Sequence, residues 1–384
     1  MRVPALLVAS LVFVPLHPHA APAPARRDAA SAPGRAALRA EPTVAIDRAL
    51  ERRVDAILAE EMQLQELPGA IVAVVRGGSV VVKKGYGEKR RGGGERPDSA
   101  TVFHIGSLSK ALAAVGALTL VQRGQLALDV PAARYLPELP KAWRAITVRQ
   151  FLAHASGIGD KVGQPATWEE ALAGYAGTPL DFAPGTRTAY TNFNYAVVGR
   201  LVESVSGRPF VAFMREDVWR PVGMVDTGYP ATSRNLATGH ERKKGPWREM
   251  LPVPQGPYGV PSGFLSTTLD DLVRLHAALE RNVALDAATR EELLTPYPGG
   301  KKNGTGMVLG WKSSRTGGRN GALVVSKNGA ADGFSSLFTW LPGRGDAVIV
   351  VVNRKGEGVE TARIVARLAE AAFGLELRAL GDEG

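Results

Sequence analysis

The stretch TVFHIGSLSKALAAVGALTLVQRG, residues 101–124, joins an extended segment to a helix. Its first six residues include β-branched and aromatic side chains, which favour an extended conformation. From Ser107 onward most residues are strong helix formers, and Gly124 is a helix stop signal. Ser107 and Lys110 are therefore expected on one helix face, with Cβ atoms roughly 5–6 Å apart.

The segments on both sides of this stretch predict a single sheet. Two β-branched runs at 70–76 and 79–87 flank Gly77-Gly78, which is a hairpin signal. Further strand-like runs in the last third of the chain lie at 307–314, 322–329, 335–342 and 346–353.

Helical apolar spacing occurs at 44–67, at 269–279 and at 359–373, and short helical patterns fill about 147–268. We therefore expect an α+β fold. In this fold an antiparallel sheet is built from both chain ends and flanked by helices, and a mostly helical insert occupies about 147–268.

The N-terminal residues predict export. One positive charge is followed by an apolar run from Ala5 to Leu16 and by small-residue cleavage sites within 21–25. The run is too short to span a bilayer, so we expect a periplasmic or secreted protein without stable membrane insertion. An uncleaved leader that anchors the chain is the alternative. The predicted divisions are a signal peptide at 1–23, a flexible leader at 24–43, one folded domain at 44–376 and a tail at 377–384.

Composition excludes several kinds of site. The chain has no Cys, which excludes disulfides, thiolate metal sites and a cysteine nucleophile. The net charge is +10, but the arginines are scattered and do not interleave with aromatic residues, so no nucleic-acid partner is expected. His240 and His276 lack metal-ligand spacing, and no glycine-rich phosphate motif occurs. We expect neither a metal nor a cofactor.

Ser107-Leu108-Ser109-Lys110 has the residues for nucleophilic catalysis. A serine hydroxyl is a poor nucleophile until a base takes its proton. A lysine can act as that base when burial or a neighbouring cation favours its neutral form. The helix N-terminus adds backbone N–H groups that stabilise an oxyanion.

Two further short motifs carry suitable groups. Tyr190 and Asn192, two residues apart on a segment expected to be extended, face the same side. A phenol can relay a proton, and an amide can bridge Lys110 and a substrate carbonyl. Lys327-Asn328-Gly329 follows a strand-like run, where a cation can bind a carboxylate and a glycine permits close backbone approach. Taken alone, Tyr190 and Asn192 fit an ordinary turn before a helix better than a site, and Lys-x-Gly also occurs at Lys83, Lys161, Lys243 and Lys302.

The order Ser-x-x-Lys, Tyr-x-Asn, Lys-x-Gly resembles the signature of the β-lactamase and penicillin-binding-protein superfamily. The resemblance is to its class C-like branch and extends from about 48 to 375. It includes FLAHASGIG at 151–159, NYAVVGRLVESVSGRPF at 194–210, PVGMVDTGY at 221–229, PSGFLSTTLDDLVRL at 261–275 and GFSSLFTWLP at 333–342.

The resemblance implies roles for these residues. Ser107 would be acylated, and Lys110 and Tyr190 would share the proton transfer. Asn192 would orient Lys110 and contact the substrate, and Lys327 would line the opposite wall. The oxyanion hole would be formed by the backbone N–H groups of Ser107 and Ala330.

The chain departs from the superfamily pattern at two positions. Many esterase-like members carry His where Lys327 stands, so Lys327 favours a carboxylate-bearing substrate. Asn328 stands where Thr or Ser is usual and lacks the hydroxyl that would bind that carboxylate. The two departures point in opposite directions and leave the substrate open.

Several functions remain open. The first is an exported hydrolase that forms an acyl-enzyme at Ser107 with an ester, amide, D-peptide or β-lactam carbonyl, its partner being a small molecule or a cell-wall peptide. A D-alanyl-D-alanine carboxypeptidase or a true β-lactamase is the narrower alternative. A non-catalytic envelope binding or regulatory protein is the alternative from another class. His104 and His154 suggest a Ser-His-Asp triad, but no G-x-S-x-G elbow accompanies them, and the resemblance implies a structural role for His154.

Overall fold

The computed structural model describes residues 44–160, 167–175, 177–231, 235–250, 256–298, 306–317 and 321–377. The predicted signal peptide, the leader and all but the first residue of the predicted tail lie outside these ranges. Within the described ranges, no helix is both long and apolar enough to cross a membrane. Those same residues contain no cluster of three or more metal-ligating side chains.

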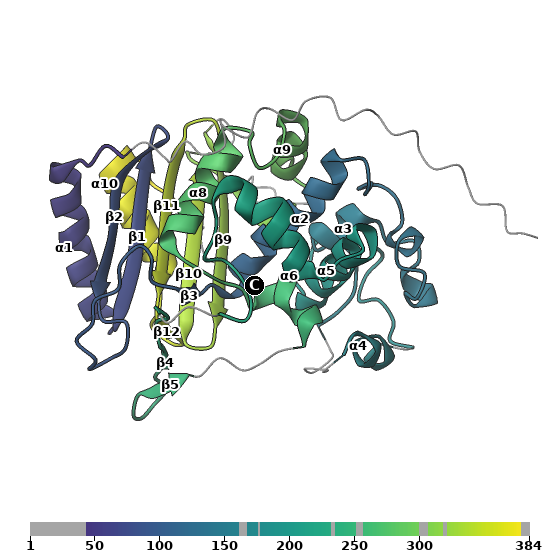
Figure 1. The fold of residues 1–384 in the computed structure, drawn as a ribbon, viewed down its shortest axis with the longest axis horizontal. Coiled ribbons are helices and arrows are strands. Elements are labelled where there is room, and N and C mark those ends of the chain that lie inside the picture. The colour runs from purple at the N-terminus through teal and green to yellow at the C-terminus, as the bar shows by residue number, and fades with distance from the viewer. Residues whose placement is uncertain are drawn as a thin grey trace, which may run out of the picture.

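A seven-stranded sheet with every neighbouring pair antiparallel forms the centre of the molecule, in the order β2-β1-β11-β10-β9-β8-β7 (Figure 1). Its strands are β1 Gly69–Arg76, β2 Ser79–Gly87, β7 Gly306–Val308, β8 Trp311–Arg315, β9 Leu323–Ala331, β10 Phe334–Leu341 and β11 Asp346–Val352. The N-terminal hairpin docks on the last long strand, and Ala73 lies opposite Ile349. This confirms the prediction of an antiparallel sheet built from both chain ends.

One predicted strand is divided in two. The run 307–314 was expected to be continuous, but it turns at Gly310 and pairs with itself as β7 and β8. Gly310 has φ +87°, and a Cβ atom there would lie 2.6 Å from the Cβ of Ala114. The turn therefore needs glycine both for its backbone conformation and for its contact with the helical layer.

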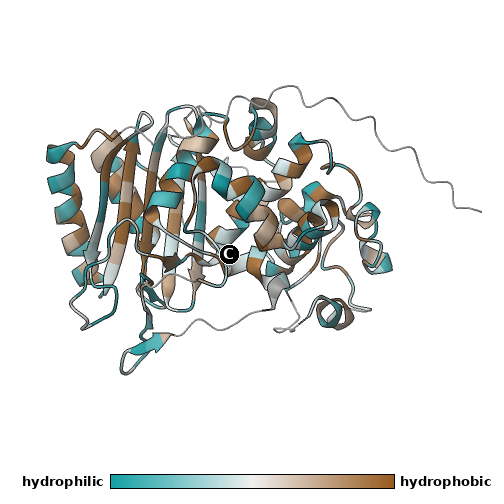
Figure 2. Ribbon diagram, viewed as in Figure 1, coloured by the Kyte–Doolittle hydropathy of each residue, from teal (hydrophilic) through white to brown (hydrophobic). Residues whose placement is uncertain are grey.

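The sheet separates two cores. On one face, α1 Arg48–Leu64 and α10 Thr361–Phe373 cover alternate apolar side chains such as Val72 and Leu337. The intervening side chains, such as Phe338, point into a larger core with the remaining helices. Figure 2 shows the apolar strands between these layers, and the outer faces of α1 carry hydrophilic residues.

The larger helical layer positions the candidate site. α2 is buried from Ser109 to Leu120 and contacts α5 and α7. The α-helices of this layer are α2 Ser109–Gln122, α3 Val148–Leu152, α4 Trp168–Gly174, α5 Asn192–Ser206, α6 Phe210–Phe213, α7 Val260–Gly263, α8 Leu269–Glu280 and α9 Ala287–Leu294. The layer thus also includes α2, α8 and α9, which lie outside the predicted insert at about 147–268 in the sequence.

Short elements connect this layer to the sheet. The 3₁₀ turns and one π-helical turn are η2 Gly106–Leu108, η3 Ala132–Arg134, η4 Lys141–Trp143, η5 Met214–Trp219 (π), η6 Arg220–Val222 and η7 Pro257–Gly259. The small strands are β3 Phe103–His104, β4 Gly239–Glu241, β5 Arg248–Met250, β6 Ser266–Thr267 and β12 Arg354–Lys355.

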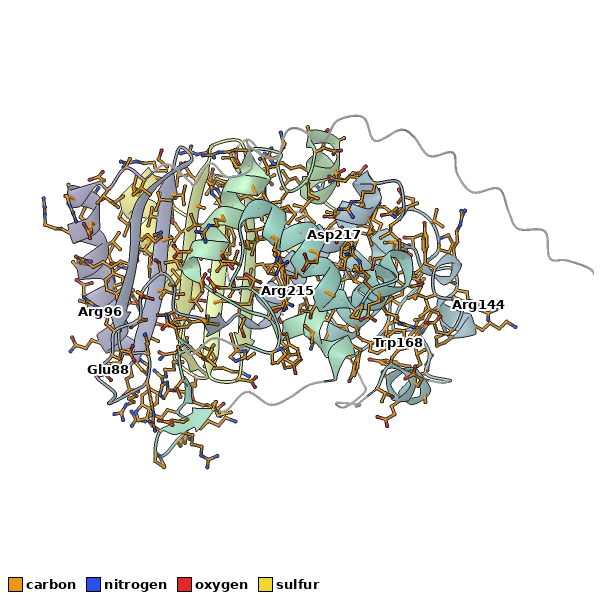
Figure 3. All side chains as sticks on the ribbon, viewed as in Figure 1. Glu88, Arg96, Arg144, Trp168, Arg215 and Asp217 are labelled. Atoms are coloured by element: carbon orange, nitrogen blue, oxygen red, sulfur yellow. The ribbon has the colours of Figure 1, made fainter. Side chains whose placement is uncertain are left out.

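Basic side chains are found at both ends of the molecule: Arg96 lies beside the N-terminal hairpin and Arg144 on the far helical side (Figure 3).

Candidate active site

Ser107 lies in the 3₁₀ turn η2, two residues before α2 begins at Ser109. The sequence predicted an α-helical start at Ser107, but the first turn is tighter, which brings residues i and i+3 nearly into line. Gly106 permits this turn because its φ is +54°. Ser336 on β10 donates a hydrogen bond of 2.8 Å to the carbonyl of Ile105, which ties the turn to the sheet.

Lys110 is completely buried, and its Nζ contacts three oxygen atoms. It lies 3.1 Å from Oγ of Ser107 and 2.8 Å from Oδ1 of Asn192. It also donates to the backbone carbonyl of Ser262, on α7. The ammonium group therefore has a fixed position between the candidate nucleophile and α5.

Tyr190 and Asn192 reach the site from the beginning of α5. The sequence predicted an extended segment through Asn192, but α5 begins at Asn192, since Thr191 is its N-cap and accepts a hydrogen bond from the N–H of Phe193. The hydroxyl of Tyr190 is 2.6 Å from Oγ of Ser107. The two motifs are thus in direct contact, although more than eighty residues separate them.

Two ammonium groups flank the ring of Tyr190. The Nζ atoms of Lys110 and Lys327 lie 4.8 Å and 4.9 Å from its centroid. Both lysines are at most 1% exposed, so water screens their charges weakly. Their positive field stabilises negative charge on the phenolic oxygen, which suits Tyr190 for accepting a proton from Ser107.

The Lys327-Asn328-Gly329 motif divides between the two faces of the sheet. Lys327 lies opposite Phe338, whose side chain enters the larger core beside the site. Asn328 lies opposite Leu337, which packs under α1 and α10. Directly opposed residues share a face, so the side chain of Asn328 points away from Ser107. Asn328 therefore borders the site with its backbone, and its role in substrate binding stays a prediction.

Gly329 and Ala330 bring β9 against the turn that holds Ser107. A Cβ atom at Gly329 would lie 2.0 Å from the carbonyl oxygen of Ile105 and 2.8 Å from the backbone nitrogen of Ser107. A Cβ at Gly106 would lie 2.4 Å from the backbone nitrogen of Ala330. The two glycines thus allow the backbones of Ser107 and Ala330 to approach closely, as a pair of oxyanion donors requires.

Sequence reasoning missed two groups that support these residues. Asp160 accepts hydrogen bonds from Nδ2 of Asn192, at 3.2 Å, and from the hydroxyl of Thr191, at 3.1 Å. This leaves Oδ1 of Asn192 directed at Lys110. The Ser262 carbonyl is the other missed group. Asp160 directly follows the quoted segment 151–159, but nothing in that local pattern indicates a contact with residues thirty positions away.

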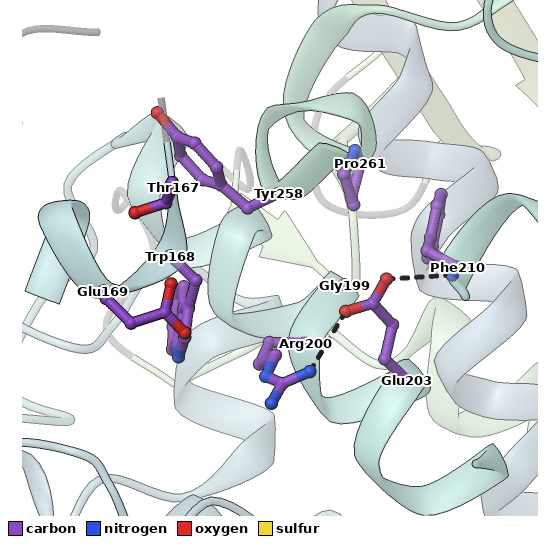
Figure 4. A pocket seen from close by; sticks show the side chains of 9 residues that line it. All are labelled: Thr167, Trp168, Glu169, Gly199, Arg200, Glu203, Phe210, Tyr258 and Pro261. Carbon is purple, nitrogen blue, oxygen red and sulfur yellow. Dashed lines mark hydrogen bonds and ion pairs between the residues drawn. The ribbon is translucent and has the colours of Figure 1, made fainter. Parts of the chain in front are cut away.

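A separate pocket of about 260 Å³ lies along α5 (Figure 4). Arg200 and Glu203 on its wall form an ion pair of 3.4 Å, and the other carboxylate oxygen of Glu203 accepts a hydrogen bond from the N–H of Phe210. None of the eight candidate site residues lines this pocket. The candidate site is thus identified by the geometry of its side chains.

Comparison with known proteins identifies the family of this chain. The family model for Beta-lactamase matches residues 54–373. The chain belongs to the beta-lactamase family. Esterase EstB from Burkholderia gladioli is 28% identical over 316 residues, which are 69% of this chain and 80% of EstB.

Two solved structures show that this member of the beta-lactamase family has the β-lactamase/transpeptidase fold. The octameric penicillin-binding protein homologue from Pyrococcus abyssi has a TM-score of 0.71 and 23% identity, with 84% of this chain and 76% of that chain covered. EstCE1, described as a hydrolase with promiscuous acyltransferase activity, has a TM-score of 0.73 and 22% identity, with 85% and 99% covered. The family and its esterase member support a serine hydrolase.

Proposed function

We propose that this protein is an exported serine hydrolase that forms an acyl-enzyme at Ser107. The observation that carries the proposal is the position of the Ser107 hydroxyl, 2.6 Å from Tyr190 and 3.1 Å from Lys110. A serine placed against a tyrosine–lysine pair that can take its proton is the arrangement that nucleophilic catalysis requires.

In the proposed reaction, Oγ of Ser107 attacks the substrate carbonyl carbon. The Tyr190–Lys110 pair takes the proton of Ser107 in the form of a phenolate beside an ammonium group, so that the phenolate oxygen of Tyr190 becomes a hydroxyl. The oxyanion accepts hydrogen bonds from the N–H groups of Ser107 and Ala330. The carbonyl then re-forms, the bond to the leaving group breaks, and the leaving group takes the proton. Water hydrolyses the acyl-serine with the same groups acting in reverse.

An ester is the substrate class that we propose first. The side chain of Asn328 faces away from the site, so the motif supplies no side-chain hydrogen bond to a carboxylate beside Lys327. EstB is an esterase by name and matches most of this chain, which supports the same choice. The second candidate is a D-peptide or β-lactam, and it is favoured by the buried ammonium group of Lys327 on the site face of β9.

Mass spectrometry can test the proposal directly. Intact protein is incubated with a nitrophenyl ester or a fluorescent penicillin, and the added mass is mapped to a peptide. We expect the adduct on Ser107 and no adduct on Ser107→Ala. Ser204→Ala is the control, because Ser204 is exposed on α5 and bonds to the carbonyl of Tyr135. Turnover or labelling by Ser107→Ala at the unmutated rate would refute the mechanism.

Comparing substrates on one sample separates the candidates. Turnover of a nitrophenyl ester, a D-Ala-D-Ala peptide and a chromogenic cephalosporin is measured side by side. Preference for the ester supports the first candidate, and preference for either of the others supports the second. The absence of both turnover and labelling across the panel would favour a non-catalytic envelope protein. Cell fractionation that finds the protein only in the cytoplasm would contradict export.

A further inference from the structure

His154 contacts the Tyr190 segment at three points. The imidazole ring lies 4.8 Å from the ring of Tyr190, centroid to centroid, at an interplanar angle of 35°. The backbone carbonyl of His154 accepts a hydrogen bond of 2.9 Å from the N–H of Ala189. Its Nδ1 atom lies 3.4 Å from the N–H of Thr191. His154 thus contacts Tyr190 and both of its chain neighbours.

These contacts specify the protonation state of His154. Thr191 N–H and the Nδ2 group of Asn194, at 3.2 Å, both approach Nδ1, which must therefore accept. Burial and the neighbouring charges of Lys327, Lys110 and Lys312 lower the pKa of His154 well below its ordinary value. The imidazole is neutral, and its proton is on Nε2.

The backbone of His154 also departs from the ordinary conformation. Its φ is +55°, in the left-handed region, and the residue is 1% exposed. A non-glycine residue held in this region costs free energy that its surroundings must offset. Here the turn after α3 directs the ring of His154 at the rings of both Tyr190 and Tyr195, the latter at 5.3 Å.

From this geometry we infer that His154 is a positioning residue, which holds the hydroxyl of Tyr190 against Ser107. The inference rests on the proposed function and extends it to a residue that does not touch the substrate. A phenol oxygen displaced by about 1 Å from the nucleophile can cost about 100-fold in rate. Because Tyr190 precedes the helix, its ring depends on tertiary contacts such as those of His154.

Three substitutions separate the contributions of His154. His154→Phe keeps a ring against Tyr190 but removes the acceptor. His154→Asn keeps an acceptor near the place of Nδ1 and tolerates positive φ, but removes the ring. His154→Leu has the shape of Asn but provides neither the ring nor the hydrogen-bond acceptor. His276→Phe is the matched control, since His276 is also 1% exposed but lies on α8 beside Trp340.

The measurements are KM and kcat for a nitrophenyl ester, with kcat expressed per Ser107 that an active-site label can modify. We expect kcat to fall about 100-fold in His154→Leu and by less in His154→Asn and His154→Phe, with KM changed less than threefold. His276→Phe should keep the unmutated kcat. If one His154 variant gives too little folded protein, the ratio of kcat per labelled site between the remaining two variants decides the question.

The two hypotheses fail in different ways. If all three His154 variants keep the unmutated kcat per labelled site, His154 is only structural and the inference is wrong. The same conclusion follows if His154→Asn and His154→Leu have equal kcat per labelled site and His154→Phe has no higher kcat than either. If Ser107→Ala is labelled or turns over like the unmutated protein, the proposed function fails instead, whatever the His154 variants do.

Discussion

The hydroxyl of Tyr190 lies closer to Oγ of Ser107 than Nζ of Lys110 does, at 2.6 Å against 3.1 Å. Lys110 reaches the serine from within its own turn, whereas Tyr190 comes from the segment before α5. The serine therefore lies against a tyrosine–lysine pair that can take its proton, and the nearer member of that pair is supplied by the tertiary fold.

Removing the hydroxyl of Tyr190 should remove most of the activity. In Tyr190→Phe the ring can keep its contacts with His154 and the two lysines, so the fold should persist. General acid–base catalysis contributes about 10²- to 10⁴-fold, and we expect kcat for a nitrophenyl ester to fall within that range. Tyr135→Phe is the control, because its hydroxyl accepts a hydrogen bond from the N–H of Ala127 and lies outside the candidate site. A Tyr190→Phe enzyme with unmutated kcat would leave Lys110 as the sole base.

Asp160 should act through the orientation of Asn192. Without its carboxylate, the amide of Asn192 can rotate and present Nδ2 to the ammonium group of Lys110. We expect Asp160→Ala to lower kcat about tenfold, the value of one charge-assisted hydrogen bond of roughly 1.5 kcal/mol. Asp129→Ala, which removes an exposed partner of Arg149, should leave kcat unchanged. Equal kcat in the two variants would exclude this role.

Gly329→Ala should damage the oxyanion donors. The added methyl would lie 2.0 Å from the carbonyl oxygen of Ile105, so β9 or the Ser107 turn must shift. Loss of one oxyanion donor costs about 10²- to 10³-fold in kcat, which is the decrease we expect. Gly228→Ala is the matched substitution, because its nearest contact would be an ordinary 3.8 Å to Arg215. An unchanged kcat in Gly329→Ala would contradict the close approach.

His276 should make stability depend on pH. Burial, and then the charges of Arg281 and Arg290, lower its pKa to about 3 from an ordinary 6.5. Between these values the unfolded chain binds a proton that the folded chain does not, so the free energy of unfolding falls as pH decreases through this window. Within this window, His276 should lower the free energy of unfolding by up to about 1.4 kcal/mol for each unit of decrease in pH.

Urea unfolding at pH 7 and pH 5 tests this prediction. The unmutated protein should lose more stability on acidification than His276→Phe, because the variant has no proton to bind at this position. Other buried histidines remain in both proteins, so the comparison isolates His276. If the two proteins show the same difference between pH 7 and pH 5, the histidine does not have the lowered pKa.

The sequence alone determined the long strands of the sheet, several of the helices and the pairing of Ser107 with Lys110. β-branched runs and glycine turns predicted the strands, because burial on both faces of a strand requires continuous apolar residues. Helical spacing predicted α1, α8 and α10 to within a few residues. Ser107 and Lys110 are three residues apart, so local backbone geometry is sufficient to bring them together.

Only the tertiary structure decided the rest of the site. The contact of Asn192 with Lys110 and the contact of His154 with Tyr190 join segments more than thirty residues apart, and they depend on how α3 and α5 pack. The face of Asn328 depends on the register of β9 with β10, since a shift of one residue would exchange it with Lys327. Residue spacing within one segment does not fix such packing or register, and it was the resemblance that implied the contact of Asn192 with Lys110.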